Sequence, residues 1–308
     1  MGTSHEFTRT RMRGSALLIA LALLAGLHGG AEAAPPRQSS KIADTAQIAA
    51  LVQQALDERR DRDAGSLLEQ AAMNGTRDPR LDLLSGELSL RRARPAAALS
   101  DFRLAARAPA NMAAALQGQG IALAMLGRSE EAMGVLKSAV KASPAAWRAW
   151  SALAGIYDNQ GAWGQAAEAY QNAIEASSSS PIVLNNRGFS YLLQRRLTEA
   201  VADFVAALQK KPDLVEARTN LRVALALNGD YPAALASGDP ADQASLLNNA
   251  GFAAGLRGDY TQAEKLLTEA MELRGQFYDR AAENLAIIRG LAARQASETP
   301  ALPASGRN

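Results

Sequence analysis

The chain repeats itself every 34 residues, and small side chains mark the repeat. One series of alanines keeps this spacing through six members and resumes 29 residues later: Ala64, Ala98, Ala132, Ala166, Ala200, Ala234 and Ala263. Two further series of small residues run in parallel: Ala71, Ala105, Ala139, Ala173 and Ala207, and Gly86, Gly120, Ala154 and Gly188, with Gly251 two further units later. A period near 34 residues indicates a helix-turn-helix unit that is stacked repeatedly into a solenoid.

The unit over residues 113–146 shows how the pattern produces two helices. Its apolar residues follow helical spacing in two segments, and Gly127 separates them. Gly120 and Ala132 are small where the two helices are expected to cross, so the helices can approach closely. Pro144 is expected to end the second helix because proline lacks an amide donor and clashes with the preceding turn.

Two segments in the middle of the chain resemble the consensus of the tetratricopeptide repeat family. The matching residues are Trp150, Leu153, Ala154, Tyr157, Ala166, Tyr170 and Ala173, and then Leu184, Gly188, Tyr191, Ala200, Phe204, Ala207 and Pro212. The resemblance implies an all-α superhelix, an α-solenoid of helix-turn-helix units. Units are expected to begin near Thr45, Pro79, Ala113, Trp147, Pro181, Val215 and Ala244, with a closing helix over residues 278–293.

One folded domain of about seven units with a C-terminal capping helix is expected over residues 45–294, because repeat arrays grow by adding neighbours to a continuous core. Hydrophobic residues make up 48% of the chain but aromatic residues only 5%, so the core must be built mainly from alanine and leucine. Gly238, Asp239 and Pro240 are expected to cut short the second helix of the sixth unit. Residues 295–308 contain two prolines and a glycine and are expected to form a disordered tail.

The first 33 residues resemble a secretory signal peptide rather than part of the fold. Three arginines precede a short apolar run over residues 14–27, and the segment ends in Ala31, Glu32 and Ala33. We expect cleavage after Ala33, a flexible leader over residues 34–44, and repeats exported to the periplasm. The alternative is an uncleaved membrane anchor, although the apolar run is short for a span.

The composition argues against catalysis. Both histidines lie within residues 1–33 and the chain has no cysteine, so an exported form lacks the usual proton shuttle, a thiol nucleophile, a site for a lipid anchor and the best transition-metal ligands. No glycine-rich phosphate-binding loop follows a strand pattern. We therefore expect a non-enzymatic protein with no cofactor, no metal and no small-molecule substrate.

The charge balance does not favour nucleic acid. The chain carries a formal net charge of +2, and residues 1–33 hold three arginines and two glutamates, which leaves +1 for the remainder. A nucleic-acid binder would need a concentrated basic face. We expect a protein or peptide partner instead.

Asparagines mark the candidate binding groove. In a stacked solenoid the first helices line the concave side, and Asn186, Asn220 and Asn249 occupy equivalent places in three of them, with Asn185 and Asn248 beside two. Amide side chains there can both donate to and accept from a peptide backbone, as the groove asparagines of tetratricopeptide proteins do. The alternative is that these amides bridge neighbouring helices. Phe189 and Arg148 are further groove candidates.

The C-terminal third resembles the TadD-like proteins of the tight-adherence (Flp) pilus system. The residues that carry this resemblance are Leu247, Asn248, Asn249, Ala250, Gly251 and Phe252, then Gly258, Asp259 and Tyr260, and finally Gln276, Phe277, Tyr278, Ala281, Ala282, Glu283, Asn284 and Leu285. The resemblance implies a role in pilus assembly, with the outer-membrane secretin or other Tad components as partners. TadD-like proteins are commonly lipoproteins, and the missing cysteine is a departure from them. A general periplasmic adaptor or chaperone for envelope assembly, cytochrome maturation or secretion is the alternative.

Overall fold

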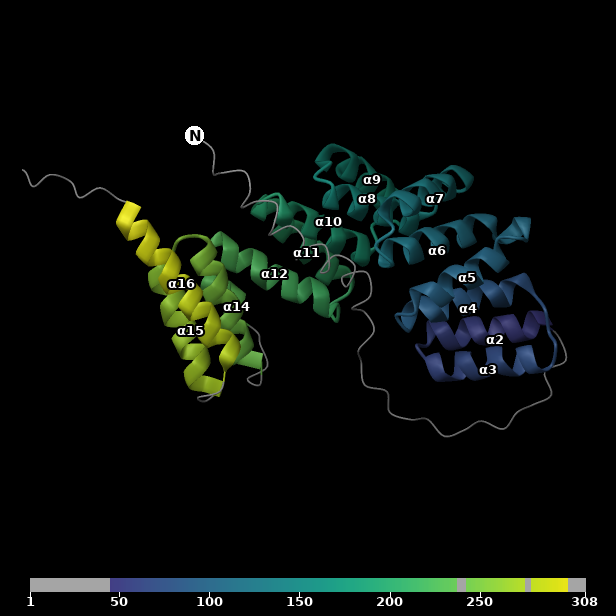
Figure 1. Cartoon of the computed structure of the whole chain (residues 1–308), viewed down its shortest axis with the longest axis horizontal. Coiled ribbons are helices and arrows are strands. Elements are labelled where there is room, and N and C mark those ends of the chain that lie inside the picture. The colour runs from purple at the N-terminus through teal and green to yellow at the C-terminus, as the bar shows by residue number, and fades with distance from the viewer. Residues whose placement is uncertain (1–44, 237–241, 275–277, 299–308) are drawn as a thin grey trace, which may run out of the picture. The chain divides into compact units, whose positions relative to one another are not determined.

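The computed structural model describes residues 45–236, 242–274 and 278–298, and within them it contains fifteen α-helices and no strand. The helices follow one another as pairs joined by tight turns (Figure 1). The pairs are α2 (Thr45–Asp57) with α3 (Asp61–Met73), α4 (Pro79–Arg91) with α5 (Pro95–Ala105), α6 (Met112–Met125) with α7 (Ser129–Ala142), α8 (Trp147–Asn159) with α9 (Trp163–Ala176), α10 (Pro181–Leu193) with α11 (Leu197–Lys210), α12 (Val215–Asn228) with α13 (Tyr231–Leu235), and α14 (Gln243–Leu256) with α15 (Tyr260–Arg274). A last helix, α16 (Asp279–Glu298), packs on the seventh pair.

The chain divides into two compact units, and the boundary lies inside α10, after Ser190. In the first unit two buried apolar clusters run from α2 to α4 and from α5 to the start of α10. In the second unit one cluster joins helices α12 to α16. The expectation of one continuous domain over residues 45–294 stays a prediction.

The alanine series lies where helices cross. The first two series are buried throughout, with Ala64, Ala98, Ala132, Ala166 and Ala200 all 0% exposed. A larger side chain at these crossings would force the helices apart, since protein interiors are close-packed. The 34-residue pattern of small residues is therefore a pattern of close helix contacts.

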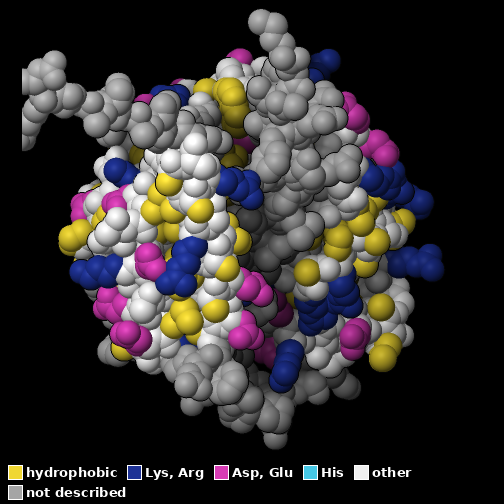
Figure 2. All heavy atoms as spheres, turned by 60° about the vertical axis from the view of Figure 1, so that its left-hand side comes forward, with side chains coloured by type: hydrophobic (Ala, Val, Ile, Leu, Met, Phe, Trp, Pro, Cys, Tyr) yellow, Lys and Arg dark blue, Asp and Glu magenta, His cyan; other side chains and the backbone are white. Residues whose placement is uncertain are grey.

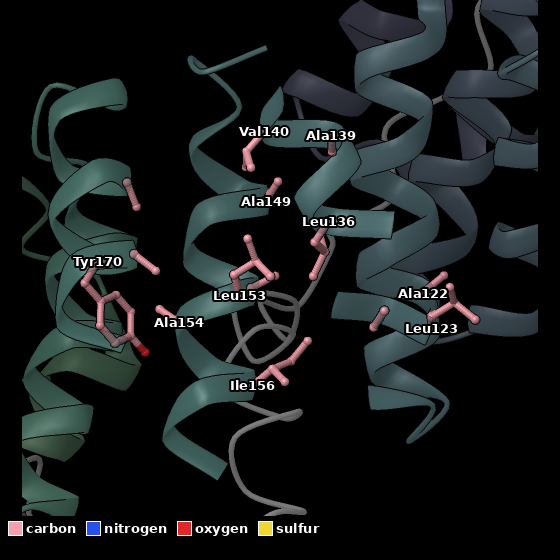
Figure 3. Close-up of a cluster of buried hydrophobic side chains, with 14 of the residues drawn as sticks. Ala122, Leu123, Leu136, Ala139, Val140, Ala149, Leu153, Ala154, Ile156 and Tyr170 are labelled. Atoms are coloured by element: carbon pink, nitrogen blue, oxygen red, sulfur yellow. The ribbon is translucent and has the colours of Figure 1, made fainter. Parts of the chain in front are cut away.

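Figure 3 shows how α8 fills the space between its neighbours. Leu153 and Ala154 of α8 lie between Val140 of α7 and Tyr170 of α9, and these side chains are buried. Alanine and leucine supply most of this cluster, as the low aromatic content predicts.

Every turn inside a pair contains one residue in the left-handed backbone conformation. These turn residues are Arg59, Ala93, Gly127, Gly161, Arg195, Gly229 and Gly258. The amide of the residue that follows each of them donates to the carbonyl five residues earlier, at 2.8 to 3.0 Å, which is the main hydrogen bond of a Schellman helix end. Glycine adopts this conformation without a Cβ penalty, yet three of the seven turns hold it with another residue.

The observed helices begin within one residue of the expected unit starts, with α6 beginning at Met112 and α14 at Gln243. The last helix is longer than expected: α16 continues to Glu298, so residues 295–298 are helical rather than part of a tail. No glycine or proline occurs between Gly290 and Pro300 to end it earlier. The expected signal peptide, leader, chain end from residue 299 and Gly238–Pro240 interruption lie outside the described residues.

Candidate functional site

In the first unit, the predicted groove asparagines lie between first helices. Asn185 and Asn186 of α10 are 3% and 8% exposed. The Asn186 Nδ2 donates to Ser151 Oγ of α8 at 3.2 Å, and the Asn185 Nδ2 donates to Asn186 Oδ1 at 3.4 Å. These contacts favour the helix-bridging alternative for this asparagine pair.

The other two groove candidates of the first unit are more accessible. Phe189 of α10 is half-buried, and Arg148 of α8 is exposed with its guanidinium 5.2 Å from the centroid of the Trp147 ring. Burial raises the pKa of Glu87 on α4, while the positive charges of Arg148 and Arg91 oppose that rise. Glu87 was not predicted, because a single glutamate in a helix gives no sequence signal of a site.

In the second unit, adjacent asparagines of α14 have different surroundings. Asn248 is 2% exposed, and its Oδ1 accepts a hydrogen bond of 2.9 Å from Asn284 Nδ2 of α16. Asn249 is exposed and accepts a hydrogen bond of 3.2 Å from Asn248 Nδ2. Asn248 thus links two helices, while Asn249 faces solvent.

A small hollow lies beside Asn249. Thr219 and Arg222 of α12 line it together with Leu246 and Asn249 of α14, and its volume is about 20 Å³, roughly the space of one water molecule. Asn220, one residue along α12, is half-buried. The structure therefore places an amide and a guanidinium together on neighbouring first helices of this unit, a pairing that the sequence pattern did not indicate.

The first unit also contains a buried acid. Asp158 of α8 is 5% exposed, and its carboxylate accepts hydrogen bonds from Ser190 Oγ at 2.6 Å and from Tyr170 Oη at 3.0 Å. Burial raises the Asp158 pKa to about 6 although the two hydrogen bonds lower it, and burial also raises the Tyr170 pKa well above its usual value. Equivalent places in four repeats hold Phe102, Leu136, Tyr170 and Phe204, and among these only Tyr170 carries a hydroxyl. That hydroxyl was the sequence signal of a polar contact at this place.

On the face shown in Figure 2, basic and acidic side chains are mixed with each other and with apolar side chains. Among the described residues, no three histidine, cysteine, aspartate or glutamate side chains are grouped so that they could hold a metal ion. In the same part of the chain no helix is both long and apolar enough to cross a membrane.

Comparison with known proteins identifies the repeat. Residues 149–181, which cover most of α8 and all of α9, match the family model of the tetratricopeptide repeat. No curated protein matches the chain.

Several solved structures have the same fold. The Cut9 and Hcn1 complex of the APC/C matches at a TM-score of 0.59 and 15% identity, covering 80% of this chain and 49% of that one. The C-terminal part of a TPR repeat-containing protein from Cytophaga hutchinsonii matches at 0.51 and 15%, covering 77% and 99%. A thermophilic TPR protein from Thermus thermophilus matches at 0.52 and 23%, covering 58% and 98%. Residues 149–181 are thus a tetratricopeptide repeat, and the helix pairs around them have the tetratricopeptide-repeat solenoid fold.

Proposed function

We propose that the protein is a non-catalytic scaffold that binds segments of partner proteins on the faces of its first helices. The observation that carries this proposal is the exposed Asn249 beside Arg222, on neighbouring first helices α14 and α12. An amide and a guanidinium can bind the carbonyl groups of an extended peptide, and the amide can also accept from its N–H groups. Asn220 on α12 belongs to the same proposed binding surface.

We further propose that the scaffold acts in the periplasm in assembly of a tight-adherence pilus, with the secretin or another Tad component as partner. The TadD-like residues from Leu247 to Leu285 and the signal-like residues 1–33 support this role. The bridge between Asn284 and Asn248 explains physically why two of the TadD-like asparagines are present, because each satisfies the other between α14 and α16.

Two double variants separate binding from folding. Asn220→Ala with Asn249→Ala should weaken partner capture by about 5- to 150-fold, since each lost hydrogen bond contributes roughly 0.5 to 1.5 kcal/mol. The melting temperature of this variant should fall less than that of the control described next, because among the described residues the Asn249 side chain bonds to Asn248 of its own helix and not to another helix. Asn186→Ala with Asn248→Ala is the matched control and should melt earlier, because it leaves Ser151 and Asn284 without their amide partners.

The measurements are thermal melting and recovery of the secretin complex from crosslinked envelope fractions. Capture unaffected by the Asn220 and Asn249 changes would contradict the proposed binding surface. Normal pilus assembly in a clean deletion strain would contradict the pilus role and favour a general envelope adaptor.

Export is tested separately by the mature N-terminus. We expect mass spectrometry of the protein from envelope fractions to find a chain that begins near Ala34, because the A-x-A sequence ends at Ala33. A chain that still begins at Met1 or Met12 would show that the segment is retained.

A further inference from the structure

A hollow of about 340 Å³ opens between the second helices α7 and α9 of the first unit. Its volume lies near the lower end of known ligand pockets, which run from roughly 300 to 1,000 Å³. Trp150, Leu153 and Tyr157 of α8 form its floor, and they share one face of that helix because they are three and four residues apart. The hollow is therefore an apolar recess whose walls are two second helices.

The floor is fixed at one end and offers a polar group at the other. The Trp150 Nε1 donates to the Pro144 carbonyl at 3.0 Å, which orients the indole, and Leu153 is 2% exposed. Tyr157 is half-buried, and its hydroxyl makes no hydrogen bond to any described residue. A ligand on this floor can meet an aromatic surface and a phenol that can donate or accept.

The two walls carry opposite charge. Lys137 and Lys141, one turn apart on α7, are exposed and form no ion pair with a described residue. Gln165 and Glu168 of α9 line the opposite side of the hollow, and Glu168 likewise forms no ion pair with a described residue. A bound peptide would be oriented, with a carboxylate toward α7 and N–H groups toward α9.

The preceding pair differs at the floor. At the floor, Leu116 and Leu123 stand 34 residues before Trp150 and Tyr157, so the preceding pair lacks the aromatic rings. At the wall, Arg103 and Arg107, in and just after α5, stand 34 residues before Lys137 and Lys141. The hollow therefore combines a basic wall from α7 with an aromatic floor from α8, and Arg103 and Arg107 supply a matched basic control.

We propose that this hollow is a second docking site, which binds a partner-protein segment that places one large apolar side chain on Trp150 and Tyr157 and an adjacent acidic residue against Lys137 and Lys141. The charge of the α7 wall selects the acidic residue, and the recess selects the apolar side chain. The site lies on α7, α8 and α9 of the first unit, whereas the surface of the proposed function lies on α12 and α14 of the second unit. A scaffold with both surfaces can hold two partner segments at once.

A peptide array tests the proposal with the purified full chain. The probes are pentapeptides with Phe, Leu, Ala or Ser at the centre and Asp, Ser or Lys at the flanking positions. Acidic peptides with central Phe or Leu should bind best. Binding of the best peptide should fall at least tenfold in Lys137→Glu with Lys141→Glu, and it should persist in Arg103→Glu with Arg107→Glu, which makes the same change in charge.

A second variant tests the recess itself. Gln165 is exposed and lines the hollow, so Gln165→Trp should cover part of the recess and remove the preference for Phe over Ala while melting is unchanged. Asn220→Ala with Asn249→Ala should leave array binding intact, so failure of the first-helix proposal would not affect this result.

Three outcomes would overturn the second site. One is an absence of selection for a central apolar residue, and another is an equal loss of binding in both charge variants. The third is concentration-dependent self-association in sedimentation that the Lys137 and Lys141 changes abolish, because the occupant would then be a second copy of this chain.

Discussion

Replacing Phe102 with alanine is expected to lower the free energy of unfolding of the first unit by about 3 to 5 kcal/mol. Phe102 is 1% exposed and lies in the core cluster that joins α5, α6 and α8. The loss combines the transfer of an aromatic ring with the cavity that remains. Urea unfolding followed by tryptophan fluorescence measures it, because Trp147, Trp150 and Trp163 all lie in the first unit.

The glycines against this ring make the test sharper. A Cβ on Gly118 would lie 2.4 Å from Phe102 Cζ, and one on Gly86 would lie 2.7 Å from Phe102 Cε1. Gly118→Ala should therefore cost about 1 to 3 kcal/mol in the unchanged protein by overpacking. In the Phe102→Ala background the same change should stabilise by up to about 1 kcal/mol, since the cavity accepts the methyl group and alanine favours helix.

Gly134→Ala in α7 is the matched control, because a Cβ there meets no atom within 4 Å. It should stabilise the unit slightly in both backgrounds. An equal effect of Gly118→Ala in both backgrounds would show that the ring does not set the spacing of these helices.

Asp158 should make the first unit more stable at pH 4 than at pH 7. Its pKa is about 6 in the folded chain against a usual value of 3.8, so the folded state binds the proton more tightly than the unfolded state. Its contribution is fully present below about pH 4 and is lost as the pH rises through 6, with a total of about 3 kcal/mol. Asp158→Asn should remove this pH dependence.

The measurement is the difference in unfolding free energy between the unchanged protein and Asp158→Asn from pH 4 to pH 8. Taking this difference cancels the contributions of Glu87 and Asp82, whose pKa values burial also raises. A difference that is constant with pH would contradict the buried, proton-binding carboxyl.

The helices could be predicted from the sequence because their signals are local and repeated. Small residues such as Ala166 recur at helix crossings, and Pro144 follows the end of α7 at Ala142. The end of α16 was missed because no residue between Ala293 and Glu298 strongly opposes a helix. Helix ends without a glycine or proline depend on weak propensities and fray.

The candidate site could be predicted only to the level of the helix. The pattern placed Asn248 and Asn249 on a first helix, but neighbouring helical residues point about 100° apart. Which of them faces inward depends on the position of α16, and Asn284 of that helix bonds to Asn248. The hollow over Trp150 and Tyr157 depends on side-chain volumes from three helices, which no single stretch of sequence specifies.

The left-handed turn residues allow the array to change length by whole modules. A chain cut after Gly127 and rejoined after Gly161 would lose one helix pair and keep the same backbone geometry at the junction. Turns with Arg59 or Ala93 at this position accept the same exchange, because these residues adopt the same left-handed conformation as the turn glycines. Duplication or loss of helix pairs can therefore adjust how many partner segments such a scaffold accommodates without requiring a new type of turn.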